Sequence, residues 1–240
     1  MTEEMPRANS RDAIHWRINE YVKDWPAGNV LDFPSGPGRL SYLLSKRGHK
    51  VIACDIEPYE DSPVPYVEGD LTKRFPFEDS TFDYAFCVDG PEHAENLYHL
   101  FREFHRVLRP EGILITSMPS FSHLESRLRY LFYGVIEAVT SYEDLQQKMR
   151  GIPGHGHINR PPFAMFRMAA EFAGFQFAHV FSDNFKKKQM FLLPIWLAIT
   201  LFTWVRGTRG SKRYYLKSSN SWPVLMGGNT MICEFRKRRA

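Results

Sequence analysis

Two carboxylates and two glycines in the first quarter of the chain have types and spacing that suit ligand binding. Asp32 follows a short apolar run, and Gly36 and Gly38 come a few residues later. Asp55 ends a second apolar run at residues 51–54. Glycines let a backbone turn closely around a ligand, and a carboxylate at a strand end can accept hydrogen bonds from both hydroxyls of a ribose. The pattern predicts that this stretch binds a nucleotide-like molecule.

The elements that position these residues are a strand, a glycine loop, a helix and a second strand over residues 29–57. Val30 and Leu31 open the first strand, and leucines at 40, 43 and 44 recur at helical spacing. Together they predict a βαβ unit of the nucleotide-binding type.

The loop departs from the pattern that binds dinucleotides. That pattern is G-x-G-x-x-G, whereas Ser41 stands at the third glycine position here. Asp32 beside the loop would repel a pyrophosphate, whereas it would attract a cation. S-Adenosylmethionine carries a ribose, an adenine, a sulfonium and an amino group, so it suits acids at both ends. An oxidoreductase that uses NADH is kept as an alternative.

Residues 32–38 resemble the first motif of the class I S-adenosylmethionine-dependent methyltransferases. That motif is an acid followed by three glycines at alternate positions, and the chain reads Asp-Phe-Pro-Ser-Gly-Pro-Gly. Pro34 replaces the first glycine, and proline lacks the amide N–H. The resemblance continues to residue 119 through a stretch at 75–83 and a helix-to-strand junction at 106–115. It implies the fold of that family and S-adenosylmethionine as the cofactor.

The resemblance also implies roles for the acids. Asp32 would bind the amino end of the cofactor, Asp55 the ribose, and Asp70 the adenine amino group. Leu71 would flank the adenine ring, although Asp70 with Gly69 is open to a second reading as a plain turn. The residues expected at the cofactor are Asp32, Pro34, Gly36, Gly38, Asp55, Ile56, Asp70, Leu71 and Asp89.

Three histidines are candidates for a catalytic role. Glu92 and His93 follow a predicted strand at 82–88, at the edge where open α/β sheets collect reacting groups, and they resemble an acid–histidine pair of the family. His155 and His157 lie in a later glycine-rich loop. A neutral imidazole near pH 7 can take a proton from a hydroxyl, so all three are general-base candidates. Helix capping is the alternative for His93 and for His157.

We expect no metal ion in this protein. His155 and His157 would point the same way on an extended segment, yet no cysteine or carboxylate nearby in the sequence completes a site. The three cysteines, Cys54, Cys87 and Cys233, stand apart within apolar runs and lack the spacing of metal ligands or of a disulfide framework.

The remaining hydrophobic patterns predict the α/β class, as a Rossmann-like doubly wound seven-stranded sheet with an apolar helical insertion before the last strand. The expected helices are 12–25, 97–108 and 163–173, with an apolar helix around 128–139, and the expected later strands are 66–67, 82–88, 113–116, 175–181 and 229–235. The last two strands of this fold form an antiparallel hairpin. The first helix would either close the cofactor cleft or cover one edge of the sheet.

One domain over residues 1–240 suits the length of the chain, 240 residues. We expect a substrate-pocket insertion at 120–160 and an apolar and basic insertion at 184–228. A formal charge of +4 falls well short of a dedicated nucleic-acid binder, so no nucleic-acid partner is expected. Residues 1–9 are polar and lack the apolar region of a signal peptide, which favours a cytoplasmic protein.

The insertion contains an uncharged run of sixteen residues, 190–205, between lysines at 186–188 and four cations at 206–213. As a helix the run would span about 24 Å, short of the roughly 30 Å hydrocarbon core of a bilayer. Its tryptophans and cationic flanks favour a segment that lies in the membrane interface. A buried helix on the sheet, or a dimer face, is the alternative. The interfacial interpretation would place the protein at the inner face of the membrane.

The sequence therefore predicts an S-adenosylmethionine-dependent methyltransferase that acts on a small or lipid-linked acceptor. Oxygen is the expected methylated atom, and carbon and nitrogen are the alternatives. An amphiphilic acceptor, such as a lipid-linked sugar or a prenylated ring compound, follows from the interfacial interpretation. The alternative is a protein that keeps the fold without catalysis and serves as a membrane-associated scaffold, which Pro34 in the glycine loop would permit.

Overall fold

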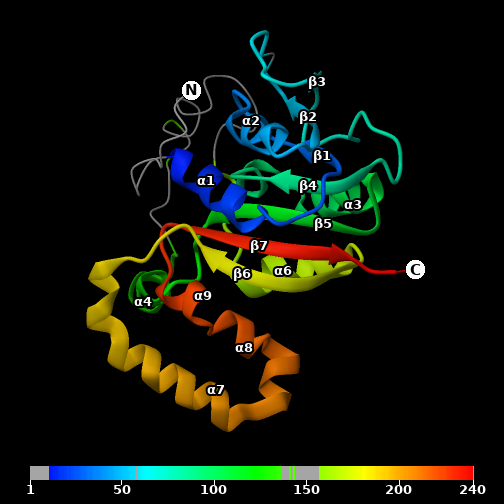
Figure 1. Ribbon diagram of the computed structural model, residues 1–240. Coiled ribbons are helices and arrows are strands. Elements are labelled where there is room, and N and C mark those ends of the chain that lie inside the picture. The colour runs from blue at the N-terminus through cyan, green and yellow to red at the C-terminus, as the bar shows by residue number, and fades with distance from the viewer. Residues whose placement is uncertain (1–10, 58, 137–140, 142, 144–156, 240) are drawn as a thin grey trace.

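The computed structural model describes residues 11–57, 59–136, 141, 143 and 157–239. Its centre is a seven-stranded sheet in the order β3-β2-β1-β4-β5-β7-β6 (Figure 1). The strands are β1 (Asn29–Asp32), β2 (Lys50–Asp55), β3 (Tyr66–Glu68), β4 (Phe82–Cys87), β5 (Leu108–Pro119), β6 (Phe175–Ser182) and β7 (Thr230–Lys237). The first five strands are parallel, and β7 is antiparallel to both β5 and β6. The predicted fold class and the antiparallel final pair are confirmed.

Helices cover both faces of this sheet because its central strands carry apolar side chains on both sides. Val30 and Leu31 are neighbours in β1 and are both fully buried. Val30 belongs to the apolar cluster that contains Ile18 and Leu44, and Leu31 belongs to the cluster that contains Phe101. Successive strand residues point to opposite faces, so one strand supplies two cores. The helices are α1 (Arg11–Tyr21) and α2 (Arg39–Lys46) on one face, and α3 (Leu97–Val107) and α6 (Phe163–Phe172) on the other.

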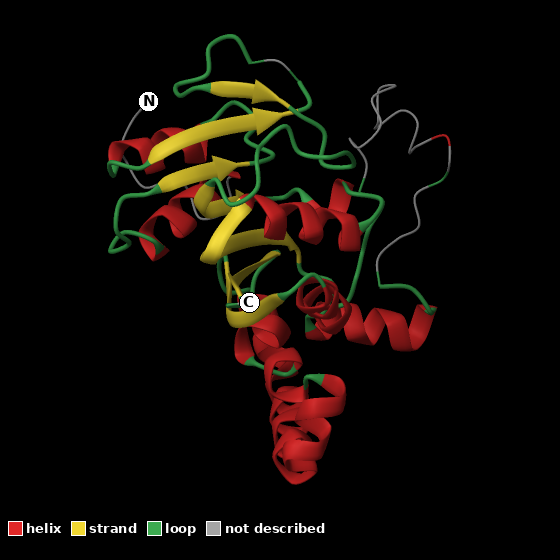
Figure 2. Cartoon of the chain, turned by 90° about the vertical axis from the view of Figure 1, so that its right-hand side faces the viewer, coloured by secondary structure: helices red, strands yellow, loops and turns green. Residues whose placement is uncertain are grey.

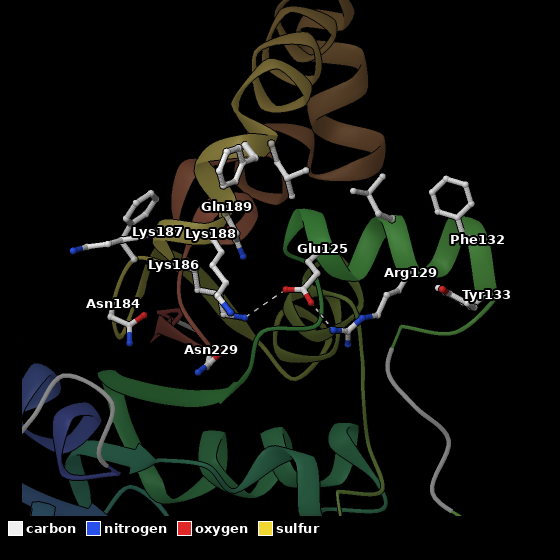
Figure 3. Close-up of a pocket in the computed structure, with 14 residues that line it drawn as sticks. Glu125, Arg129, Phe132, Tyr133, Asn184, Lys186, Lys187, Lys188, Gln189 and Asn229 are labelled. Carbon is white, nitrogen blue, oxygen red and sulfur yellow. Dashed lines mark hydrogen bonds and ion pairs between the residues drawn. The ribbon is translucent and has the colours of Figure 1, made fainter.

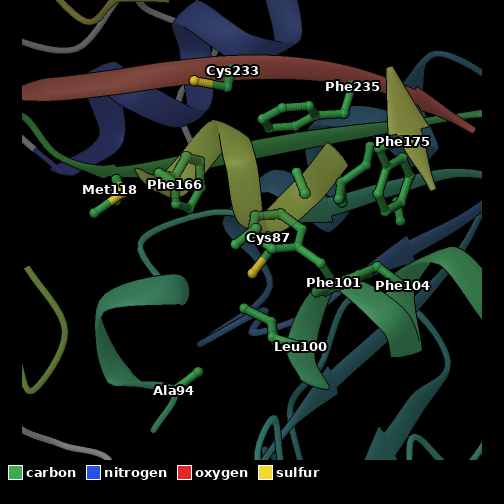
Figure 4. Packing of buried hydrophobic residues seen from close by; sticks show 14 of the residues in the cluster. Cys87, Ala94, Leu100, Phe101, Phe104, Met118, Phe166, Phe175, Cys233 and Phe235 are labelled. Carbon is green, nitrogen blue, oxygen red and sulfur yellow. The ribbon is translucent and has the colours of Figure 1, made fainter. Parts of the chain in front are cut away.

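The larger core, on the α3 and α6 face, contains many phenylalanine rings (Figure 4). The ring of Phe101 in α3 lies 5.2 Å from that of Phe166 in α6 and 5.8 Å from that of Phe235 in β7. These are edge-on contacts, which aromatic pairs prefer to face-to-face stacking. They tie the antiparallel end of the sheet to the helices that follow β4 and precede β6.

The insertion before β7 leaves the sheet and projects as a helical arm (Figures 1 and 2). It consists of the 3₁₀ helix η2 (Lys187–Leu192), α7 (Leu193–Tyr214), α8 (Leu216–Ser219) and α9 (Trp222–Met226). Gly207 has non-helical backbone angles and kinks α7. The base of the arm packs on α4 (Leu124–Tyr133) through a small apolar cluster that includes Leu124 and Leu225, with Trp196 against it.

Several predicted boundaries shift in the structure. The first helix ends at Tyr21 rather than at residue 25, and β5 begins at Leu108, where it already pairs with Phe82. The apolar helix expected around 128–139 is α4, which begins earlier and ends before Gly134, a glycine with a φ of +70°. Such a left-handed residue is the usual end of a helix, and glycine adopts it without a steric penalty.

Candidate active site

A cavity of about 620 Å³ opens between the carboxyl ends of β1 and β4, where the strand order of the sheet reverses. Open α/β sheets bind ligands at this switch point, because the loops after the two strands diverge there. Nine predicted residues line the cavity: Pro34, Gly36, Asp55, Ile56, Asp70, Leu71, Asp89, His93 and His157.

Asp55, at the end of β2, holds the glycine loop in place. Its carboxylate accepts hydrogen bonds from the backbone N–H of Gly36 and from that of Ile56, both at 2.7 Å. Gly36 has a φ of +51°, and a Cβ there would meet nothing within 4 Å. The glycine is therefore needed for its backbone conformation, and the space beside it is open to a ligand.

Asp70 follows β3 on the same side of the cavity. Its Oδ1 accepts hydrogen bonds from the backbone N–H of Thr72 at 2.8 Å and from the Thr72 hydroxyl at 2.7 Å, and Lys73 lies 3.4 Å from its other oxygen. Partial burial opposes ionisation, but these hydrogen bonds and the lysine outweigh it and lower the pKa of Asp70. Asp70 therefore forms the turn of the alternative interpretation, and it also lines the cavity, while its contact with an adenine stays a prediction.

Asp32 and Gly38 do not line the cavity, and their contacts are with the loop and the helix α2 beside it. Asp32 is fully buried and accepts a hydrogen bond from the hydroxyl of Ser41 at 2.6 Å. Burial raises the pKa of Asp32 to about 7. Gly38 has a φ of +77° at the start of α2, and a Cβ there would lie 2.8 Å from Pro63. Both residues shape the loop from behind.

The other end of the cavity holds Glu92, His93 and His157. Glu92 and His93 lie in the 3₁₀ helix η1 (Pro91–His93) after β4. The backbone oxygen of Glu92 accepts hydrogen bonds from the N–H groups of Ile158 and Asn159, which brings His157 to within 5.1 Å of the His93 ring. Two of the three predicted histidines therefore meet in space. His155 lies outside the described residues.

The capping alternatives for these histidines find no support. The side chain of Asn96 caps α3, and Pro162 precedes α6, which has no side-chain cap. A histidine does cap a helix elsewhere, because the Nδ1 of His123 accepts a hydrogen bond from the backbone N–H of Ser126 in α4. No sequence pattern predicted this cap, since histidine is not among the preferred N-cap residues.

Comparison with known proteins agrees with this geometry. Residues 31–116 match the family described as a methyltransferase domain. A solved S-adenosylmethionine-dependent methyltransferase from Archaeoglobus fulgidus superimposes with a TM-score of 0.58, at 14% identity, over 95% of both chains. The PH0226 protein of Pyrococcus horikoshii gives a TM-score of 0.55 at 19% identity, over 98% of this chain and 95% of that one. Residues 31–116 therefore carry a methyltransferase domain, and the chain has the fold of S-adenosylmethionine-dependent methyltransferases.

The curated relatives of this methyltransferase domain share only part of their length with it. Sterol methyltransferase-like 3 of Botryococcus braunii is 36% identical over 112 residues, which cover 40% of this chain and 28% of the relative. The sterol 24-C-methyltransferase of Schizosaccharomyces pombe is 40% identical over 37% of this chain and 23% of its own. A demethylmenaquinone methyltransferase of Chlorobaculum tepidum is 31% identical over 35% of this chain and 37% of the relative. The chain spans less than two fifths of the length of each.

The residues of the methyltransferase domain fit S-adenosylmethionine by their chemistry. Two carboxylates, Asp55 and Asp70, face one cavity beside an open glycine backbone, and Ile56 and Leu71 add apolar surface to the same wall. A nucleoside with hydroxyls, an apolar ring and an amino group requires this mixture of acceptors and apolar contacts.

The sequence did not point to two cavity residues that lie outside the resemblance at 29–119. His15 of α1 and Thr230 at the start of β7 both line the cavity. In addition, Ile18 is buried against the sheet, so α1 both borders the cleft and covers the sheet. Neither residue stands in a motif, and only the packing of α1 and the pairing of β5 with β7 bring them to this edge.

Proposed function

We propose that this protein transfers the methyl group of S-adenosylmethionine to an oxygen atom of a lipid-like acceptor at a membrane surface. The observation that carries the proposal is the cavity at the switch point, with acids that suit a nucleoside at one end and two histidines at the other. A ligand that fills such a cavity is held between its nucleoside contacts and a possible proton acceptor.

Residues at one end of the cavity would bind the cofactor, and residues at the other end would accept the proton of the acceptor. Asp55 would hold the ribose hydroxyls and Asp70 the adenine amino group. S-Adenosylmethionine supplies, when bound, an electrophilic methyl carbon on a sulfonium. The acceptor oxygen gives up its proton to His93 or His157 and bonds to that carbon, while the carbon–sulfur bond breaks with its electron pair left on sulfur. Positioning supplies most of the acceleration.

A lipid-like acceptor is supported by the names of the relatives and by the surface of the chain. The relatives include sterol and demethylmenaquinone methyltransferases, whose named substrates are apolar ring compounds. In this chain Phe191 is 89% exposed, Trp204 79% and Leu201 61%. Apolar patches of this kind on an otherwise soluble fold mark interaction surfaces.

The apolar arm, which we define as residues 187–214, presents these side chains. It is long and apolar enough to cross a membrane by length and composition alone, and its most apolar stretch is not buried in the described structure. This exposure supports the interfacial interpretation over a helix that is buried on the sheet. The uncharged part ends at Val205, and the kink at Gly207 with cations on both sides of it favours an arm that lies in the interface.

A basic hollow lies beside the root of the arm, between α4 and η2 (Figure 3). Its volume is about 1110 Å³, and its cations are Arg129, Lys186, Lys187 and Lys188. Glu125 offsets part of this charge, because it forms ion pairs with Arg129 and with Lys186. The excess positive charge next to exposed Phe132 and Phe191 suits an anionic lipid surface.

The test of methyl transfer uses S-adenosylmethionine labelled in its methyl group, with demethylmenaquinol and a sterol as acceptors. We expect label in the lipid extract of at least one acceptor, attached to oxygen and therefore released by hydriodic acid, and none with an Asp55→Ala variant. A protein that binds no S-adenosylmethionine by calorimetry would overturn the proposal and would favour the scaffold alternative.

The test of the membrane surface is flotation with vesicles of phosphatidylglycerol and phosphatidylcholine. We expect the protein to float with the anionic vesicles, and a Leu201→Glu/Trp204→Glu variant to stay in the soluble fraction. Phe172→Glu is the matched control, because Phe172 is 76% exposed on α6, outside the arm. A parent protein that does not float, but forms a dimer that the double variant disrupts, would instead identify the arm as a dimer face.

A further inference from the structure

Three metal-binding side chains converge at the acceptor end of the cavity. One carboxylate oxygen of Glu92 and one ring nitrogen each of His93 and His157 all lie within 4.8 Å of one another. The sequence places His157 far from the other two, but the hydrogen bonds of Ile158 and Asn159 to the backbone of Glu92 fix it there. The carboxylate that the sequence could not find for His157 is supplied by the fold.

The carboxyl group of Glu92 is the unusual member of this group. The residue is 1% exposed, and its Oε2 has no hydrogen-bond partner in the described part of the chain. Burial, helped by the nearby charge of Asp89, raises the pKa of Glu92 well above its usual value. A buried carboxyl oxygen without a partner is costly, so an orphaned one in a cavity points to a ligand that completes it.

We propose that Glu92, His93 and His157 form a binding site for a divalent transition-metal ion. Two imidazoles and one carboxylate are a donor set that zinc, iron and cobalt ions share, and three protein ligands leave coordination positions open to a small molecule. Magnesium, which prefers oxygen ligands, suits this set less well. A cation here would also offset the two neighbouring acids, Glu92 and Asp89.

If the proposed function holds, this metal site would narrow the acceptor to a compound with a hydroxyl or phenol oxygen. An open position beside the cofactor cavity suits a hydroxyl or phenol oxygen, whose pKa falls when it binds a divalent ion. The hydroxyl proton would then pass to solvent rather than to an imidazole, and the oxygen keeps the electron pair that attacks the methyl carbon. An acceptor without such an oxygen would gain nothing from the ion.

The experiment is a titration of chelator-treated full-length protein with Co²⁺, followed by visible absorption, and with Zn²⁺, followed by calorimetry. We expect about one ion per chain and cobalt bands that report nitrogen and oxygen ligands. Loss of a residue that only supports a metal ligand typically weakens metal binding by about 10- to 100-fold. Glu92→Gln and His157→Ala remove ligands themselves, so each should weaken binding by about 100-fold or more. Glu95→Gln and His179→Gln change exposed side chains outside the site and should leave the affinity unchanged.

Binding that is absent, or that survives both Glu92→Gln and His157→Ala, would overturn the site. His157 is exposed, so its variant should fold even if a change at buried Glu92 does not, and circular dichroism checks both. The readout needs neither cofactor nor turnover. Metal binding without methyl transfer would therefore reject the proposed function alone, and methyl transfer that survives chelation would reject the role of the ion in catalysis.

Discussion

Replacement of Asp32 by asparagine should stabilise the protein at neutral pH and should do so in a strongly pH-dependent way. Asp32 is fully buried, and burial raises the pKa of its carboxyl from 3.8 to about 7. Between these values the folded chain holds a proton that the unfolded chain has lost, so the free energy of unfolding falls as pH rises. Each pH unit in that window costs about 1.4 kcal/mol, and the loss is about 4 kcal/mol when the folded carboxyl is ionised.

Asparagine resembles the protonated carboxyl in shape, and its side-chain oxygen can still accept the hydrogen bond from Ser41. Asp32→Asn should therefore exceed the parent protein in unfolding free energy by about 2 kcal/mol near pH 5 and by about 4 kcal/mol near pH 8. Urea denaturation followed by tryptophan fluorescence measures both values at one ionic strength. Asp24→Asn is the control, because Asp24 is exposed, and it should follow the parent protein.

A difference between Asp32→Asn and the parent protein that stays constant from about pH 5 to about pH 8 would refute this reasoning. The same experiment tests the cofactor role implied for Asp32. If the amino group of S-adenosylmethionine lies near this carboxylate, a saturating concentration of cofactor should lower the pKa of Asp32 and flatten the pH dependence of the parent protein.

Three further substitutions test the loop, an ion pair and a close contact. Asp55→Ala removes the acceptor of the Gly36 and Ile56 amides as well as the proposed ribose contact. Calorimetry should therefore show that the affinity for the cofactor falls by about 100-fold, and a fall of less than about threefold would contradict the assignment. Arg106→Met leaves the Glu103 carboxylate without its ion-pair partner, in a side chain that is 11% exposed. Urea denaturation should show that the free energy of unfolding falls by about 3 kcal/mol, whereas an unchanged midpoint would mean that the ion pair does not stabilise the fold. Gly90→Ala places a Cβ 2.5 Å from Pro34 and 2.8 Å from Cys87, so the free energy of unfolding should fall by about 1–3 kcal/mol. The shift of Pro34 should also weaken cofactor binding, and an unchanged affinity for the cofactor would contradict this second effect.

The sequence predicted the part of the site that depends on local order along the chain. Parallel strands of a doubly wound sheet end at one edge, so acids and glycines just after predicted strands had to face that edge together. Gly36, Asp55, Asp70 and Asp89 accordingly line one cavity. The strands themselves were found from their apolar runs, because strands covered on both faces leave few polar positions.

The ends of helices were predicted less well, since they depend on single capping contacts. The start of α4 rests on His123, whose ring accepts a hydrogen bond from the Ser126 amide, and the end rests on the left-handed conformation of Gly134. In the same way β5 begins at Leu108 because it pairs with Phe82, a partner that the chain's local pattern does not name.

By itself, then, the sequence determined the fold class, the antiparallel last pair and the acids that line the cavity, because hydrophobic periodicity and the residues at strand ends are local properties. Only the tertiary structure decided three matters. Asp32 lies behind the loop, because α2 brings Ser41 onto its carboxylate. His157 meets Glu92, because backbone hydrogen bonds join two distant segments. The apolar arm is largely exposed, because exposure depends on what packs against a helix. In the described structure most of its apolar side chains face outward, whereas Leu192, Trp196 and Ile199 pack at its base.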